Sequence, residues 1–247
     1  MSDFRSFAEI DEPEGSEILL STAESRHLVR VHRISPEEKV VVFNGRGREW
    51  TCRFLKELGG KARLEVLAQH QIPPPANSIA LAQALPKGKN FEQIIRKATE
   101  IGVSAIFPLI TSRTEIKLAG DRQQNKLAKW KTTAIEAAKQ CGNSHLPEIA
   151  PVQSLDEFLT ESEVFDLKLI ASLQPDARNL RSILQTYTEK PSRSVWMVGP
   201  EGDFTNEEYL AAAEVGFEPV SLGPLVLRCE TAAIYSLSIL SYELQLP

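Results

Sequence analysis

The second half of the chain has a pattern that few folds accommodate. Short apolar segments alternate with segments of helical periodicity from residue 78 to residue 244. The predicted strands are residues 78–85, 103–110, 166–173, 194–198 and 219–222. The predicted helices are residues 90–102, 123–140, 176–187, 206–215 and 231–244. This alternation indicates an α/β domain with a mostly parallel sheet and helices on both faces.

Two of these helices carry recognisable end signals. Asn90 and Gln93 have the spacing of a capping box, and Gly102 is placed to end the helix that they begin. Thr205 and Glu208 have the same capping spacing at the start of a later helix.

The segment HQIPPPANS at residues 70–78 separates this half from an N-terminal half of different character. Three consecutive prolines favour an extended, semi-rigid spacer. We therefore place a domain boundary there, with one domain at residues 1–72 and the other at residues 73–247. A chain of 247 residues is long enough for both.

The N-terminal half has the short alternating segments of a β-rich domain. Asn44 and Gly45 form a strong hairpin signal between predicted strands at residues 39–43 and 50–55, and residues 62–69 follow as another strand. We expect a small barrel or half-barrel.

A helical segment at residues 24–33 precedes the hairpin. It places Arg26, Arg30 and Arg33 at i, i+4 and i+7 spacing along one face. The barrel is therefore expected to carry a basic helix face.

Charge is distributed unevenly along the chain. The formal net charge of −5 argues against a nucleic acid partner if it is taken globally. Between residues 22 and 63, however, ten Lys and Arg stand against five Glu, and between residues 113 and 131 six basic residues stand against two acidic ones. Such patches suit phosphates, with binding that weakens as salt rises. Solvation of exposed faces is the alternative explanation.

The sequence predicts neither a membrane anchor nor a metal site. No apolar run reaches the length of about 20 residues that a bilayer requires, and the polar, acidic N-terminus does not resemble a secretory signal. An odd number of cysteines predicts reduced thiols in a cytoplasmic protein. The four histidines show no metal-ligand spacing.

Two predicted strands end at a Gly-Pro pair, in VWMVGPEGDFTNEE and in SLGPLVLRCETAA. Ordinary tight turns explain such pairs. Alternatively, the loops converge on a ligand, because open α/β sheets bind ligands beyond the carboxyl ends of their strands. Gly199, Gly202 and Gly223 would let the main chain approach that ligand closely, with Glu201 beside it.

Arg228 and Glu230 flank Cys229 just before the last helix. They form either a local ion pair with an acidic residue favoured at a helix N-terminus, or a fixed cation beside a ligand pocket. We do not expect Cys229 to be a nucleophile, since no histidine lies in either stretch.

The last helix is apolar on more than one side. Ala233, Leu237, Leu240 and Leu244 form one stripe, while Tyr235 and others lie elsewhere. Such a helix is usually buried on more than one side. Either a second subunit or the N-terminal domain would cover the remaining face.

These motifs resemble those of the bacterial 16S rRNA uridine-N3 methyltransferases of the SPOUT superfamily. The resemblance rests on GPEGDF with its following Thr-x-x-Glu, on SLGPLVLRCETAA, and on LAQALPKGKNFEQIIRKATEIGVSAIFPLITSRTE. The segment AIEAAKQCGNSHLPEIAP is also similar, and RHLVRVHRISPEEKVVVFNGRG resembles the family's PUA-like RNA-binding domain. The similarity covers nearly the whole chain.

The resemblance implies a trefoil-knotted C-terminal domain that binds S-adenosylmethionine, a PUA-like β-barrel domain and a homodimer. The implied partner is 16S rRNA or the small ribosomal subunit, and the implied reaction is methylation of N3 of a uridine near the decoding site. The implied cofactor residues are Leu173, Gly199, Pro200, Glu201, Gly202, Leu222, Gly223, Pro224 and Leu227.

Methyl transfer to a ring nitrogen calls for a fixed cation at the developing negative charge, and the matching residue is Arg228. Glu230 or Glu201 would act as a base, unless the pocket acidifies the uridine itself. The implied RNA contacts are Arg26, Arg30, Arg33, Arg46, Lys87 and Lys89.

The chain departs from the family's pattern at four positions. Leu225 and Asn143 stand where arginines are common, and Asp203 and Glu38 stand where glycine is common. The missing arginines leave open a non-catalytic RNA-binding or ribosome-assembly factor. A second alternative is a methyltransferase of the same superfamily with another RNA target.

Overall fold

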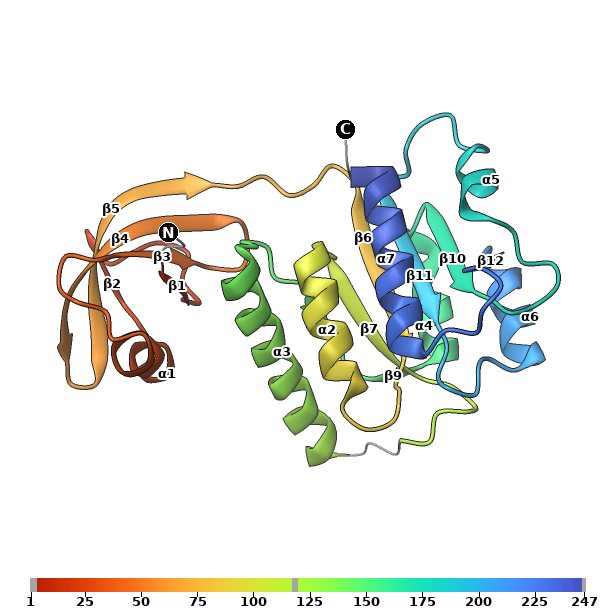
Figure 1. The fold of residues 1–247 in the computed structure, drawn as a ribbon, viewed down its shortest axis with the longest axis horizontal. Coiled ribbons are helices and arrows are strands. Elements are labelled where there is room, and N and C mark those ends of the chain that lie inside the picture. Colours follow the sequence, from red (N-terminus) through yellow and green to blue (C-terminus); the bar gives the residue numbers. More distant parts are fainter. Residues whose placement is uncertain (1–3, 117–119, 246–247) are drawn as a thin grey trace. The chain divides into compact units, whose positions relative to one another are not determined.

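The computed structural model describes residues 4–116 and 120–245. Its contacts divide the chain into two compact units (Figure 1). Unit 1 comprises residues 1–74 with 135–146, and unit 2 comprises residues 75–134 with 147–247. The helix α3 (Asp121–Cys141) thus contributes its last turns to unit 1.

Unit 1 is built on a five-stranded sheet with strand order β1-β3-β4-β5-β2. Only the pair β1·β3 is parallel. Trp50, Leu28 and Leu64 are fully buried in its core. Along β4, buried residues alternate with partly exposed ones. The elements are β1 (Phe4–Phe7), β2 (Glu17–Leu19), α1 (Thr22–Arg26), η1 (His27–Val31), β3 (Lys39–Phe43), β4 (Arg48–Leu58) and β5 (Lys61–Gln71).

The predicted helix at residues 24–33 is wrong in its second half. The α-helical turn α1 passes into a π-helix, η1, in which the His32 N–H donates to the His27 carbonyl at 3.1 Å. Arg33 follows with a φ of 54°, outside the helix. Because a π-turn changes the angular spacing of side chains, Arg26, Arg30 and Arg33 do not form one α-helical face.

Unit 2 is built on a parallel sheet, as predicted. Its strand order is β12-β10-β11-β6-β7-β8, with β9 paired to β7. The strands are β6 (Ser78–Ala84), β7 (Ala105–Ile110), β8 (Glu148–Ile149), β9 (Gln153–Ser154), β10 (Leu167–Ala171), β11 (Arg193–Val198) and β12 (Glu218–Val220). The short strands β8 and β9 were not predicted.

Helices cover both faces of this sheet, so the predicted α/β class is confirmed (Figure 1). Helices α4 and α6 bury Phe158 and Ala212 against Val195 and Met197 of β11. On the other face α2 and α7 lie side by side. The remaining elements are α2 (Asn90–Ile101), α4 (Leu155–Glu161), η2 (Ser162–Val164), α5 (Leu180–Leu184), α6 (Asn206–Glu214) and α7 (Cys229–Gln245).

Two expectations about these helices are wrong. The helix predicted at residues 176–187 is shortened to α5, because Arg178 pairs with the backbone of β12 and Asn179 caps the helix only afterwards. At α2, Lys89 is the N-cap and no side chain caps it; the Asn90 amide instead donates to Glu230 at 3.4 Å. The end of α2 at Gly102, with a φ of 90°, is confirmed.

The capping box of α6 is confirmed in both bonds. The Thr205 hydroxyl accepts from the Glu208 N–H, and the Glu208 carboxylate accepts from the Thr205 N–H. The same carboxylate also accepts from the Ser112 N–H at 2.7 Å, which fastens the loop after β7 to the start of α6.

Candidate functional site

Three loops meet at the carboxyl edge of the sheet in unit 2. Strand β10 lies between β11 and β12, and all three are parallel, so the loops that leave them open on the same side. A cavity of about 310 Å³ lies among these loops and the start of α7. Its lining comprises Ala171, Ser172, Leu173, Val198, Gly199, Pro200, Glu201, Asp203, Leu222, Gly223, Leu225, Val226, Leu227, Arg228, Cys229 and Ala232.

Most of the residues singled out in the sequence lie around this cavity. Both Gly-Pro loops contribute, together with Leu173 from the loop after β10 and Arg228. Gly202 and Pro224 belong to the same loops but do not line the cavity. Glu230 does not line it either, and its carboxylate accepts from Asn90.

The loop at residues 199–204 is held from several sides. The buried Gln83 amide donates to the carbonyls of Val198 and Gly199, each at 3.3 Å. Arg113 donates to the Gly202 carbonyl at 2.6 Å. The Glu201 carboxylate accepts from the Lys87 N–H at 3.0 Å. A loop fixed in this way loses little conformational entropy when it binds a ligand.

Gly199 has a steric requirement that an ordinary turn does not impose. Its φ lies outside the left-handed region, yet a Cβ there would lie 3.2 Å from the Phe204 ring and 3.3 Å from the Asp203 carboxylate. For a Cβ at Gly202 the three nearest atoms all belong to the flexible side chain of Arg113, the first of them also at 3.2 Å. The two glycines of one loop therefore differ in what a methyl group would displace.

Asp203 was not predicted as a site residue, yet it lines the cavity. Its φ of 62° is a left-handed conformation, which glycine adopts more readily than a residue with a Cβ. The Asp203 carboxylate accepts from the Tyr209 hydroxyl at 2.9 Å and from the Phe204 N–H at 2.8 Å. Burial and the nearby Asp203 raise the pKa of Tyr209, so the phenol remains a donor and fixes the carboxylate. Asp203 lies in the motif GPEGDF, and this position in the motif is the sequence signal that could have identified it as a site residue.

Arg228 and its neighbours lie at the rim of the cavity. Arg228 is exposed and, among the described residues, forms no ion pair, so the expected alternative of a pair with Glu230 is not observed. Burial, the hydrogen bond to Glu230 and the charge of Glu201 raise the pKa of the Cys229 thiol to about 12. A neutral thiol is a weak nucleophile, in agreement with the sequence-based expectation.

The predicted RNA contacts are distributed over both units. In unit 1, Arg26, Arg30 and Arg33 are exposed, and Arg46 pairs with Asp11 at 2.5 Å. In unit 2, Lys89 is exposed, and Lys87 pairs with Glu115 at 2.8 Å. Lys117 of the second basic run lies outside the described residues.

The cavity in unit 2 suits a ligand with apolar and cationic parts. Leucine, valine and alanine side chains provide apolar walls, and backbone groups of the loops provide polar contacts. Glu201 and Asp203 provide two carboxylates, and Arg228 one cation. Within residues 4–116 and 120–245 there is no cluster of potential metal ligands, and no helix there has the length and hydropathy to span a membrane.

Family comparison divides the chain in a similar way. A family model described as an RNA methyltransferase domain matches residues 73–241, which contain the whole cavity. A second model, described as an RNA methyltransferase PUA domain, matches residues 20–67.

Related proteins resemble the chain over most of its length. It is 35% identical to ribosomal RNA small subunit methyltransferase E of Synechocystis, covering 90% of this chain and 71% of the relative. It is 29% identical to the Bacillus subtilis protein of that name, covering 90% and 89%.

Two solved structures share the fold. A putative methyltransferase from Legionella pneumophila, in complex with the bound cofactor SAM, superposes with a TM-score of 0.90 at 32% identity, covering 98% of both chains. The ribosomal RNA small subunit methyltransferase E from Neisseria gonorrhoeae, bound to S-adenosylmethionine, superposes with a TM-score of 0.87 at 29% identity, again covering 98% of both chains.

Proposed function

Because this chain belongs to the RNA methyltransferase family, we propose that it is an S-adenosylmethionine-dependent methyltransferase of small-subunit ribosomal RNA. The proposed acceptor atom is N3 of a uridine, and the proposed target is uridine 1498 near the decoding site. The observation that carries the proposal is the cavity formed by the loops after β10, β11 and β12.

The residues around the cavity fit S-adenosylmethionine. The cofactor carries a sulfonium and an ammonium group, and the carboxylates of Glu201 and Asp203 provide the opposite charge. An adenine ring suits the apolar walls of the cavity, and the lack of a Cβ at Gly199 keeps the loop close to Phe204 and Asp203. When bound, the cofactor supplies an electrophilic methyl group. We assign its binding to Leu173, Gly199, Pro200, Glu201, Gly202, Leu222, Gly223, Pro224 and Leu227, and add Asp203.

Arg228 is the proposed catalytic cation. When N3 of a uridine loses its proton, negative charge spreads to the adjacent carbonyl oxygens. Arg228 lines the cavity, is exposed and has no ion-pair partner among the described residues. A guanidinium that is not neutralised by a carboxylate remains available to stabilise that charge.

Glu230 and Glu201 are the two proposed bases, unless the pocket acidifies the uridine itself. The Glu201 carboxylate accepts from the Lys87 N–H at 3.0 Å, and this bond ties it to the loop after β6. The Glu230 carboxylate is held by the longer contact from Asn90, at 3.4 Å, and by the Cys229 thiol at 3.3 Å. Glu201 lines the cavity and Glu230 does not, so the base is the carboxylate that reaches the N3 proton of the bound uridine.

The target uridine must leave its stack to reach the cavity. The family match to a PUA domain in unit 1 and its exposed arginines support RNA binding there. Arg26, Arg30, Arg33 and Arg46 of unit 1, with Lys87 and Lys89 of unit 2, are the proposed contacts to the rRNA backbone.

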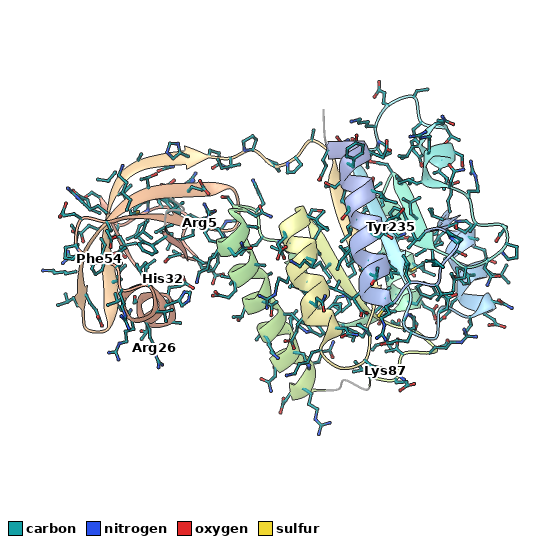
Figure 2. All side chains as sticks on the ribbon, viewed as in Figure 1. Arg5, Arg26, His32, Phe54, Lys87 and Tyr235 are labelled. Carbon is teal, nitrogen blue, oxygen red and sulfur yellow. The ribbon has the colours of Figure 1, made fainter. Side chains whose placement is uncertain are left out.

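A homodimer is part of the proposal. The stripe Ala233, Leu237, Leu240 and Leu244 of α7 is buried within unit 2, whereas Tyr235 and Tyr242 on the same helix are 47% and 69% exposed. Tyr235 is labelled in Figure 2. A second subunit would cover these rings. The trefoil knot, the boundary between residues 72 and 73, and action in the cytoplasm stay predictions.

Two measurements test the function. Calorimetry should detect binding of S-adenosylmethionine to the purified full chain, and no binding at millimolar cofactor would reject the enzyme in favour of a non-catalytic RNA-binding factor. Mass mapping of modified nucleotides in ribosomes from a deletion strain should show loss of one methyl group at the proposed uridine. Unchanged methylation there would assign the enzyme to another RNA target.

A further inference from the structure

A second hollow lies entirely within unit 1, outside the proposed cofactor site. Its volume is about 710 Å³. Residues from β1, η1, β3 and the end of α3 surround it, all of them assigned to unit 1. The lining comprises Phe4, Arg5, His27, His32, Val41, Glu136, Lys139, Gln140, Cys141 and Gly142.

The π-turn η1 brings aromatic rings together at this hollow. Because the His32 N–H bonds five residues back to His27, the two imidazoles lie with centroids 4.6 Å apart. The Phe4 ring lies 5.3 Å from the His32 ring. The hollow thus has a wall of three rings, and π-turns of this kind are frequent at functional sites.

The charges around the hollow are balanced. Lys139, whose side chain is 6% exposed, contacts Glu24 at 3.1 Å and Glu136 at 3.0 Å. Arg5 pairs with Glu49 at 2.8 Å. Partial burial, His27 and Lys139 lower the pKa of His32. A hollow with compensated charges is poorly suited to an anion, so a phosphate is not the group that it recognises.

The hydrogen-bond donors and acceptors around the hollow suit a heterocyclic ring. Lys139 lies 3.2 Å from His27 Nδ1, and since an ammonium can only donate, the neutral His27 ring carries its proton on Nε2. Arg5 Nε is buried and has no hydrogen-bond partner among residues 4–116 and 120–245. Gln140 offers both a donor and an acceptor. Donors and acceptors beside aromatic rings on which a base can stack are the means by which proteins bind unstacked nucleobases.

We propose that this hollow binds one unstacked nucleobase of the RNA substrate, with Phe4 and His32 as its stacking platform. The inference rests on the proposed function only in taking RNA as the source of the base. Arg26 and Arg30, which are exposed on α1 and η1, meet the neighbouring phosphates. Figure 2 shows Arg5, Arg26 and His32 in this unit.

The test compares labelled single-stranded RNA homopolymers of about ten nucleotides with an abasic strand of equal length, by fluorescence anisotropy with the full chain. We expect at least one homopolymer to bind about tenfold more tightly than the abasic strand, which is the scale of one stacked base. His32→Ala should remove this difference, and His32→Phe should restore it. The exposed His70 of the same unit provides the control: His70→Ala should bind like the unmodified protein.

Salt separates stacking from charge. The loss in His32→Ala should be the same at about 50 mM and about 200 mM salt, whereas the loss in Arg30→Ala should shrink as salt rises. His32 is exposed, so its truncation leaves the core of unit 1 in place. Equal affinity of His32→Ala and the unmodified protein for every strand would overturn the proposal, as would a loss that His32→Phe does not restore.

Cofactor calorimetry on the same samples keeps the two proposals apart. Failure of the unmodified protein to bind S-adenosylmethionine would reject the proposed function and leave the RNA result intact. Cofactor binding with no preference for a base-carrying strand would reject the hollow alone.

Discussion

The hollows of the two units are built from different material. The cavity in unit 2 lies among three loops that follow parallel strands, and two glycines, apolar side chains and Arg228 line it. The hollow in unit 1 is formed by large side chains gathered by a π-turn and the end of α3. A site made of backbone depends on conformation and close approach, whereas a site made of side chains depends on their identity.

The two sites also differ in charge. In unit 1 each described cation at the hollow has a carboxylate partner. In unit 2 Arg228 has none among the described residues. Substitutions that separate backbone geometry from side-chain chemistry therefore test the comparison most directly.

Removing the unpaired cation should have the largest effect. Arg228→Ala is expected to lower kcat about 10²–10³-fold, the range for losing one group that stabilises developing negative charge, with cofactor affinity largely kept. The measurement is steady-state methyl transfer together with calorimetry. Arg181→Ala, which changes an exposed arginine of α5 in the same unit, is the control. Near-normal turnover in Arg228→Ala would remove Arg228 from the mechanism.

Adding one methyl group to the loop after β11 tests its backbone geometry. Gly199→Ala is expected to weaken cofactor binding about tenfold or more, because its Cβ would press on the Phe204 ring and the Asp203 carboxylate. Gly202→Ala is the matched comparison, with a smaller loss since the Arg113 side chain can move aside. Equal dissociation constants for the two variants would contradict a backbone-built pocket.

The left-handed residue of that loop should affect stability. Asp203→Ala is expected to cost about 1–2 kcal/mol of unfolding free energy, since alanine is strained at a φ of 62° and the bond from Tyr209 is lost. Asp203→Gly should cost less, because glycine accepts this conformation. Urea unfolding measures both. A more stable alanine variant would show that the conformation imposes no strain.

The smallest expected effect concerns the reactivity of the cysteine thiols, and it is the same in both units. Burial raises the pKa of Cys52 in unit 1 and of Cys229 in unit 2 to about 12, from 9.0. Both thiols therefore remain protonated near neutral pH, and iodoacetamide should modify the exposed Cys141 first.

The same pKa values fix the sign of a stability change. An unfolded thiol ionises near pH 9, whereas the folded thiols ionise near pH 12, so the stability that these groups contribute is present below about pH 9 and falls as pH rises toward 12. Mass spectrometry of peptides from the iodoacetamide-treated protein measures the order in which the cysteines are alkylated, with Cys141→Ser as control. Fast labelling of Cys229 at pH 8 would contradict its burial.

Sequence patterns predicted elements well where local signals and packing agree. The alternation of strands and helices, the end of α2 at Gly102 and the capping box of α6 depend on residues close in the chain. Prediction failed where a residue with a local capping or helical signal bonds instead to a partner far away in the chain. Asn90 donates to Glu230 instead of capping α2, and Arg178 pairs with β12 instead of entering a helix.

Local sequence patterns establish that two strands end in Gly-Pro loops and that an arginine follows the second of them. Strand pairing in the folded chain places β10 between those strands and so brings a third loop to the cavity, which Asp203 also lines. Strand order arises from pairing between residues far apart in the chain. Local periodicity contains no information about such partners.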